Sequence, residues 1–193
     1  VLKPNSSAKT GEPDLKFVAA SPVIWSIHLH DFAVRGDGPG APTQRYAGSH
    51  GISFIVPDTN HQFTEIRLER IYAAALGDDG FHIEGHDIGS GAIVFVYGVA
   101  LEAIECWGSG FYIRNSTVVE MHNCYANGNR LFGGYAKDSQ VAWFSCAFEN
   151  NCRFVGSAPV VPGGADTLVY DTTWGAQLRL NSCHPGRIDA CDF

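Results

Sequence analysis

Apolar and polar residues alternate along five stretches of the chain, and each stretch loses the alternation for one residue near its middle before resuming it. A period of two is typical of a β-strand with one buried face. Each stretch therefore predicts a strand, a bend and a second strand. The stretches are residues 27–34, 66–73, 99–106, 119–126 and 141–148, with a weaker sixth at 178–185.

Aligning the stretches at the bend places their apolar residues in three columns that we expect to point inward. The middle column has spacings of 39, 33, 20 and 22 residues, which predicts a unit of about 20 to 22 residues with loop insertions in the early units. The columns are Leu29, Leu68, Leu101, Met121 and Trp143; Phe32, Ile71, Ile104, Cys124 and Cys146; and Val34, Ala73, Cys106, Ala126 and Phe148.

Glycine precedes an apolar residue in a second register, at Gly51-Ile52, Gly80-Phe81 and Gly110-Phe111. Glycine suits a tight corner, which needs a positive φ or a close approach of two backbones. Short strands, a fixed unit and glycine corners predict a solenoid of stacked parallel sheets. A β-sandwich also has short alternating strands, but it does not require the same break in every stretch.

The repeat with its glycine turns resembles the right-handed parallel β-helix, or pectin-lyase-like, superfamily over residues 22–156 and more weakly to 185. This resemblance implies an all-β chain forming one right-handed parallel β-helix domain over residues 1–193, with about six or seven coils. Loop insertions fall in the early coils, and residues 157–193 supply a C-terminal loop and the last coil.

Within the superfamily, the loop-rich early coils are similar to those of phage tailspike and depolymerase chains. Such chains normally begin with a capping helix and earlier coils, and they are trimeric. The resemblance therefore implies a homotrimer, or a fragment of a longer chain whose flanking segments cover the open edge. It also implies an extracellular or virion-associated location.

Composition excludes several other classes of protein. The net charge of −7, with no run of Lys or Arg, argues against nucleic acid as a partner. The longest apolar run, residues 92–101, is too short to span a membrane as a helix. Aromatic residues make up 12 % of the chain, which is ample for a core and excludes disorder.

The 6 cysteines do not suggest a metal site, because no C-x-x-C pair is present. Cys106, Cys124 and Cys146 fall in inward columns, where we expect buried free thiols. Cys183 and Cys191 remain candidates for a disulfide in an oxidising compartment. We expect no metal and no cofactor, apart from Ca²⁺ if the protein is a lyase.

The outward columns of the same alignment bring aromatic and acidic residues onto one sheet. Sugar rings stack on aromatic faces, and carboxylates bind their hydroxyl groups. Ordinary ladders across an exposed sheet would also use such residues. The predicted substrate-binding residues on this sheet are Tyr72, Trp107, Tyr125 and His122, and the predicted catalytic carboxylates are Glu102, Glu105 and Glu120.

Glycoside hydrolysis needs two carboxyl groups about 5 Å apart for retention, or about 6.5 to 9.5 Å apart for inversion. Stacked units place equivalent positions roughly 4.8 Å apart, and alternate units roughly 9.6 Å apart. The alignment puts Glu102 and Glu120 on adjacent units in offset columns, and Glu69 and Glu102 in one column. Either pair satisfies the requirement.

The turn Gly77-Asp78-Asp79-Gly80 is similar to the paired aspartates of polygalacturonase-type β-helix hydrolases, with His82 and His86 close behind. That resemblance makes Asp78 and Asp79 catalytic candidates. The family's Asn-Thr-Asp and Arg-Ile-Lys elements are not found in order, however. Asp-Gly turns are also common corners in which Asp binds its own backbone.

Elimination from a uronate needs a base and a cation that neutralises the carboxylate, roles that Arg67 and Arg70 suit. Surface ion pairs explain these arginines equally well. The sequence thus predicts a carbohydrate-active β-helix that binds a polysaccharide and cleaves it by hydrolysis or β-elimination. The alternatives are a non-catalytic adhesin or tail component that binds glycan or spaces other domains, and an epimerase or inactive relative.

Overall fold

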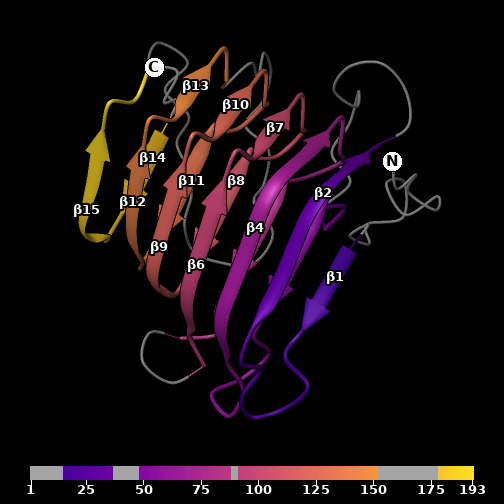
Figure 1. The fold of residues 1–193 in the computed structure, drawn as a ribbon, viewed down its shortest axis with the longest axis vertical. Coiled ribbons are helices and arrows are strands. Elements are labelled where there is room, and N and C mark those ends of the chain that lie inside the picture. The colour runs from indigo at the N-terminus through magenta and orange to yellow at the C-terminus, as the bar shows by residue number, and fades with distance from the viewer. Residues whose placement is uncertain (1–14, 37–47, 88–90, 152–177) are drawn as a thin grey trace.

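A computed structural model describes residues 15–36, 48–87, 91–151 and 178–193 (Figure 1). These residues form an all-β structure in which every named strand pair is parallel, and no helix occurs among them. The all-β class and the parallel pairing predicted from the sequence are confirmed. The strands are β1 (Leu15–Val18), β2 (Ile27–Arg35), β3 (Ile52–Ile55), β4 (Phe63–Ala74), β5 (Phe81–Glu84), β6 (Ile93–Val99), β7 (Glu102–Ile104), β8 (Phe111–Arg114), β9 (Ser116–His122), β10 (Tyr125–Asn127), β11 (Gly134–Lys137), β12 (Gln140–Phe144), β13 (Ala147–Glu149), β14 (Leu178–Asn181) and β15 (His184–Asp189).

The strands form two sheets that the chain visits in turn. A 6-stranded sheet has the order β1-β3-β5-β8-β11-β14. A 9-stranded sheet has the order β13-β10-β7-β4-β6-β9-β12-β15, with β2 also paired to β4. The long strand β4 pairs with β6 along its first half and with β7 along its second. Figure 1 shows β2, β4, β6, β9 and β12 side by side, pointing in the same direction.

Most residues with positive φ fall in three rows, each of which runs through several repeats. One row interrupts the strands of the 9-stranded sheet. The break in alternation predicted from the sequence coincides with this row at Asp31, Arg70, Asn123 and Ser145, and it is wrong by three residues in the stretch 99–106, where Ala100 holds the positive φ. The row comprises Asp31, Arg70, Ala100, Asn123, Ser145 and Ala190, with φ between 50° and 59°. A second row comprises Ala75, Glu105, Gly128 and Asn150, and a third comprises Asn115, Asp138 and Ser182.

The predicted register of residues 99–106 is wrong by three residues. Leu68 pairs with Gly98 rather than Leu101, and Ala73 pairs with Ala103 rather than Cys106. The error arose because this stretch alternates acceptably in both registers, whereas only the left-handed Ala100 fixes the bend. The stretches 27–34, 66–73, 119–126 and 141–148 have the predicted register, with Leu29 beside Leu68 and Met121 beside Trp143. The weaker sixth stretch, 178–185, is wrong: residues 178–181 form β14 of the 6-stranded sheet, and β15 is the strand that pairs with β12.

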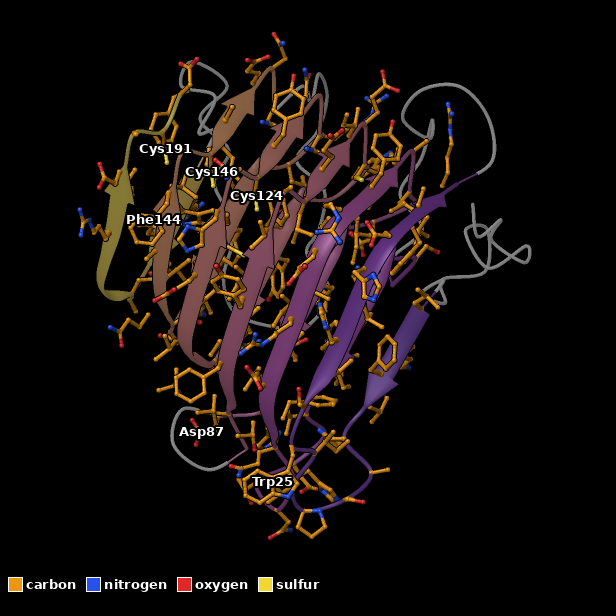
Figure 2. All side chains as sticks on the ribbon, in the orientation of Figure 1. Trp25, Asp87, Cys124, Phe144, Cys146 and Cys191 are labelled. Carbon is orange, nitrogen blue, oxygen red and sulfur yellow. The ribbon has the colours of Figure 1, made fainter. Side chains whose placement is uncertain are left out.

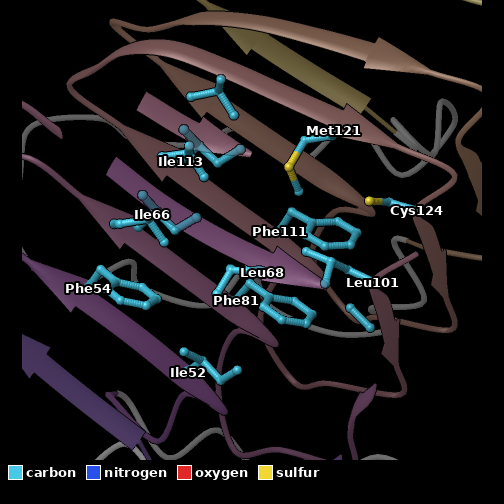
Figure 3. Close-up of a cluster of buried hydrophobic side chains, with 14 of the residues drawn as sticks. Ile52, Phe54, Ile66, Leu68, Phe81, Leu101, Phe111, Ile113, Met121 and Cys124 are labelled. Carbon is cyan, nitrogen blue, oxygen red and sulfur yellow. The ribbon is translucent and has the colours of Figure 1, made fainter. Parts of the chain in front are cut away.

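The core lies between the two sheets, where their inward residues meet (Figure 3). Phe81 and Phe111 stack with ring centroids 5.2 Å apart, and Trp143 packs edge-on against Phe111 at 5.8 Å. A Cβ at Gly80 would lie 2.8 Å from the Gly110 carbonyl oxygen. The glycine corners are therefore explained by close approach of successive backbones and not by positive φ.

The cysteines behave as small apolar side chains. Cys106, Cys124 and Cys146 are buried free thiols, as predicted. Cys183 and Cys191 are also free, so the structure contains no bridge between them. Figure 2 shows Cys124, Cys146 and Cys191 in a row in successive repeats, where each directly follows a bend of the 9-stranded sheet. Cys152, the long C-terminal loop and most of the insert after Gly36 lie outside the described residues.

Candidate functional site

The corner before β5 buries both aspartates of the Gly77-Asp78-Asp79-Gly80 turn, which are 1 % and 4 % exposed. The Asp78 Oδ2 atom accepts a hydrogen bond of 2.8 Å from the Gly48 N–H. The Asp79 Oδ1 atom accepts one of 2.7 Å from the Ser109 N–H. These carboxylates therefore bind the backbone of preceding and following repeats and are not open to a polymer in solvent.

Two histidines complete a buried cluster around Asp79, which we call the His50–Asp79–His82 cluster. The Asp79 Oδ2 atom lies 2.9 Å from His82 Nδ1 and 3.3 Å from His50 Nδ1. The three donor atoms all lie within 4.8 Å of one another. His82 projects from β5, and His50 lies just before β3. The parallel pairing of these two strands brings His50 beside Asp79, although 29 residues separate them in the sequence.

His82 is held at both ring nitrogens. Its Nε2 atom lies 3.0 Å from Glu84 Oε2, and the other oxygen of Glu84 accepts a bond of 3.2 Å from Arg114 Nη1. Both partners follow from the register, because Glu84 is two residues along β5 and Arg114 pairs with Glu84 on β8. The result is a charged chain from Asp79 to Arg114 that fixes the plane of the His82 ring.

The electrostatics of the cluster favour charged forms in spite of burial. Burial opposes a charged His82, but hydrogen bonds to Asp79 and Glu84 outweigh it and raise its pKa to about 9. Burial likewise opposes a charged Asp79, but hydrogen bonds to His50 and His82 hold its pKa well below the ordinary value. Without a bound cation, an imidazolium therefore lies between two carboxylates at neutral pH.

An aromatic stack continues from this cluster along the 6-stranded sheet. The His50 and His82 rings stack with centroids 3.9 Å apart, and His82 stacks on Tyr112 at 4.5 Å. Tyr112 stacks in turn on Tyr135 at 5.2 Å. Burial, followed by the nearby Glu84 and Asp79 charges, raises the pKa of Tyr112. The stack supports the histidine rings from one side.

A second group of predicted residues lies on the outward face of the 9-stranded sheet. Tyr72, Glu102 and Tyr125 are register partners on β4, β7 and β10. Glu102 is exposed, and the two tyrosines are partly exposed. We call this row the aromatic–acid row. Glu102 takes the place that the alignment gave to Glu105, because of the three-residue register shift.

Polar groups gather around the hydroxyl of Tyr125. It donates a hydrogen bond of 2.9 Å to Glu149 Oε2 and accepts one from the Asn127 side-chain amide. The hydrogen bond from Asn127 lowers the pKa of Tyr125, but burial and then the interactions with Glu149 and Glu102 outweigh it, so the pKa is raised. The Tyr125 hydroxyl therefore bonds one carboxylate, that of Glu149, and Tyr125 is in register with a second acidic residue, Glu102.

A second outward strip follows β6, β9 and β12. Glu120 pairs with Tyr97 in one row, and His122 pairs with Val99 in the next. The His122 ring stacks on Phe144 with centroids 4.6 Å apart and lies 5.3 Å from Tyr97. The predicted residues Glu120 and His122 are therefore together, across the bend from the aromatic–acid row.

The two arginines form surface ion pairs. Arg67 Nε donates to Glu65 Oε1 at 2.6 Å, and Arg70 donates two hydrogen bonds to Asp31. Arg70 also reaches Glu69 at 3.3 Å. These pairs occupy the guanidinium groups that a uronate carboxylate would need.

Three placements differ from the sequence predictions. Trp107, just after the left-handed corner at Glu105, is 7 % exposed and does not offer its ring to solvent. Glu105 itself lies at that corner. Glu69 pairs with Val99, so Glu69 and Glu102 do not share a row.

Sequence reasoning missed His50, Glu84, Arg114 and Tyr97 as members of these groups. His50 gave no signal, because it follows an insert outside the repeat. Glu84 and Arg114 did give a signal. Both follow a glycine corner, Gly80 or Gly110, at the same distance in sequence, so aligning these corners predicts that they are neighbours on adjacent strands. Tyr97 was hidden by the register shift.

Comparison of the chain with protein-family models, with curated protein sequences and with solved structures found no match in any of the three. In the part of the chain that the structure describes, no helix has the length and apolar character needed to cross a membrane. The chemistry of both groups is therefore derived from this chain's own residues.

Proposed function

We propose that the protein is a right-handed parallel β-helix that binds a polysaccharide across the outward face of its 9-stranded sheet. The observation that carries the proposal is the aromatic–acid row, in which Tyr72, Glu102 and Tyr125 stand in register on three adjacent strands. The alternation of the chain between two parallel sheets, with three rows of positive-φ bends, supports the closed helix.

The row has the chemistry that a sugar chain requires. Adjacent strands lie about 4.7 to 4.9 Å apart, so the two tyrosines flank Glu102 at roughly that spacing on each side. Aromatic rings offer flat apolar surface to the faces of a pyranose, and the carboxylate accepts hydrogen bonds from its hydroxyl groups. A glycan would run across the strands, along the stacking direction of the repeats.

Binding is tested with a panel of acidic and neutral polysaccharides in affinity gel electrophoresis. Tyr72→Ala and Tyr125→Ala are each expected to weaken binding of the recognised polymer about fivefold, given roughly 1 kcal/mol per stacked ring. Trp25→Ala is the matched control, because Trp25 is an aromatic residue 75 % exposed away from the row. Equal loss in all three variants, or no binding by the wild type, would reject the proposal.

Cleavage of the bound polymer is a second candidate function. Glu102 is the register partner of Tyr125 on β7, and Glu149 on β13 accepts a hydrogen bond from the Tyr125 hydroxyl, so the two carboxylates lie on the strands on either side of β10. Hydrolysis needs such a pair. Glu102→Gln is expected to abolish the release of reducing ends while keeping glycan retardation, and elimination would instead produce unsaturated uronates, with Ca²⁺ as the expected cofactor. Binding without either product leaves a non-catalytic adhesin or tail component.

Assembly and location remain part of the proposal. The strands β1 and β14 end the 6-stranded sheet within the described residues, and open parallel edges pair readily with other chains. A homotrimer or flanking segments of a longer chain would cover them, as in extracellular or virion-associated fibres. The mass of the protein in solution distinguishes a trimer from a monomer.

A further inference from the structure

We propose that the His50–Asp79–His82 cluster binds one divalent transition-metal ion, of the class of Zn²⁺. Two imidazoles and one carboxylate form a donor set that such ions prefer over Mg²⁺ or Ca²⁺, which favour oxygen ligands alone. The proposal concerns the 6-stranded sheet and is independent of glycan binding on the other sheet. It revises the expectation, drawn from the sequence, that the chain holds no metal.

The donor atoms are close to the spacing of a tetrahedral site. Ligands bound at 2.0 to 2.1 Å around Zn²⁺ lie roughly 3.3 Å apart. The His50 Nδ1 to Asp79 Oδ2 distance is 3.3 Å, and the His82 Nδ1 to Asp79 Oδ2 distance is 2.9 Å. All three atoms lie within 4.8 Å of one another. Side-chain shifts of about 1.5 Å or less therefore bring them to the spacing of a tetrahedral site.

The hydrogen bonding of His50 favours a cation between it and Asp79. The His50 Nδ1 atom lies 3.3 Å from the Asp79 backbone N–H and also 3.3 Å from the Asp79 Oδ2 atom. Both contacts are long for a hydrogen bond, so this nitrogen makes no single strong one. A metal ion between His50 Nδ1 and Asp79 Oδ2 would replace a long contact with two short bonds.

The outer shell of a metal site is already in place. Glu84 holds the Nε2 atom of His82, which leaves Nδ1 directed at the cluster. Carboxylate–histidine–metal arrangements of this kind orient the ring and increase its basicity. Arg114 fixes Glu84, and the Ser109 N–H fixes the second oxygen of Asp79. Each of these contacts survives if an ion replaces the direct hydrogen bond between His82 and Asp79.

One buried hydroxyl beside the cluster points to a further ligand. Ser53 pairs with His82 in the register of β3 and β5, so the two side chains share a face of the sheet. Ser53 is 0 % exposed, and among the described residues its Oγ has no hydrogen-bond partner. A water in the fourth position of the ion would supply that partner, since open positions of three-ligand sites are filled by water.

The ion would join two successive repeats. His50 precedes β3, Asp79 lies in the corner before β5, and His82 lies on β5 itself. A metal bound by the folded chain but not by the unfolded chain stabilises the fold through its binding free energy. The expected role is therefore structural, at a corner where two carboxylates and two imidazoles are packed together.

The test uses Co²⁺ as a spectroscopic probe and Zn²⁺ as its competitor, added to chelator-treated protein. The wild type is expected to bind one equivalent of Co²⁺ with the visible absorption of a four-coordinate ion, to lose it to Zn²⁺, and to melt at a higher temperature with Zn²⁺ bound. His50→Gln should weaken binding by more than the roughly 10- to 100-fold cost of losing an outer-shell partner. His86→Gln, an exposed histidine near the end of β5, is the matched control.

Glu84→Gln provides a second variant that keeps all three ligands. It should fold, keep the stoichiometry and weaken Co²⁺ binding about 10- to 100-fold, because it alters only the support of His82. The proposal is overturned if the wild type shows no spectrum or no stabilisation, or if His50→Gln and His86→Gln bind Co²⁺ equally. Glycan retardation should be unchanged in all these variants, so failure of one proposal does not imply failure of the other.

Discussion

The two sheets place carboxylates in opposite environments. Asp79 on the side of the 6-stranded sheet is 4 % exposed and shares hydrogen bonds with two histidines and a backbone N–H. Glu102 on the 9-stranded sheet is exposed between two tyrosines. A buried carboxylate must be paired, whereas an exposed one is free to meet a solute. The same repeat therefore supports a fixed polar cluster on one side and an accessible binding row on the other.

Removing each carboxylate in turn is the strongest test of the difference between buried Asp79 and exposed Glu102. Asp79→Ala is expected to lower the free energy of unfolding by about 3 to 5 kcal/mol, because buried His82 loses its charged partner. Glu102→Ala should change it little. Urea unfolding followed by tryptophan fluorescence measures both, and similar losses for the two variants would contradict the assignment of opposite environments.

The pH dependence of stability isolates His82. Its pKa is raised from 6.5 to about 9 by the folded state, so the folded chain holds this proton more tightly than the unfolded chain. The stabilisation is complete below about pH 6.5 and is lost as the pH rises towards 9, a change on the order of 3 kcal/mol. In metal-free protein, melting temperatures should fall over this window in the wild type and stay flatter in His82→Gln. Parallel curves would show that His82 does not carry the effect.

Crowding at the corner sharpens the comparison further. A Cβ at Gly108 would lie 2.4 Å from Asp79 Oδ1 and 2.7 Å from Asp78 Oδ1. Gly108→Ala is expected to cost about 1 to 3 kcal/mol and to weaken Co²⁺ binding, because the carboxylates must move. Ser109→Ala serves as the control, since it keeps the N–H that binds Asp79. Thermal unfolding and Co²⁺ titration measure both effects. Equal melting temperatures and equal Co²⁺ affinities for Gly108→Ala and Ser109→Ala would contradict this expectation.

The smallest effect is expected at the exposed row. Tyr125→Phe removes the hydrogen bond to Glu149 but keeps the ring, so glycan retardation should stay within about twofold and stability within about 1 kcal/mol. Tyr125→Ala should lose retardation, as proposed above. If Tyr125→Phe loses as much as Tyr125→Ala, the hydroxyl and not the ring makes the contact.

Local alternation and glycine corners were sufficient to predict the all-β class, the parallel pairing and the interior of most repeats. Leu29 and Leu68, or Met121 and Trp143, were paired correctly because their stretches alternate in only one register. Residues 99–106 alternate in two registers, and only backbone geometry at Ala100 distinguishes them. This one ambiguity displaced Glu102 and hid Tyr97.

The candidate sites depended on longer-range information. Asp79 and His82 were visible as a local motif, but His50 joins them across 29 residues through strand pairing. The exposure of a side chain could not be read from the local pattern either, because Trp107 falls in an outward column of the alignment and is nevertheless 7 % exposed. Side-chain chemistry predicted the residue types of both groups, and three-dimensional register decided which residues met.

The left-handed row through the 9-stranded sheet sets the limits of variation along its crease. Only the backbone conformation is common to Asp31, Arg70, Ala100, Asn123, Ser145 and Ala190, whose side chains are acidic, basic, apolar and polar. A non-glycine residue in this conformation costs roughly 1 kcal/mol, so glycine at Ala100 or Ser145 would relieve strain without moving either half of the sheet. The bend therefore keeps one backbone shape while its side chains differ, so each repeat can present a different residue at this line on the protein surface.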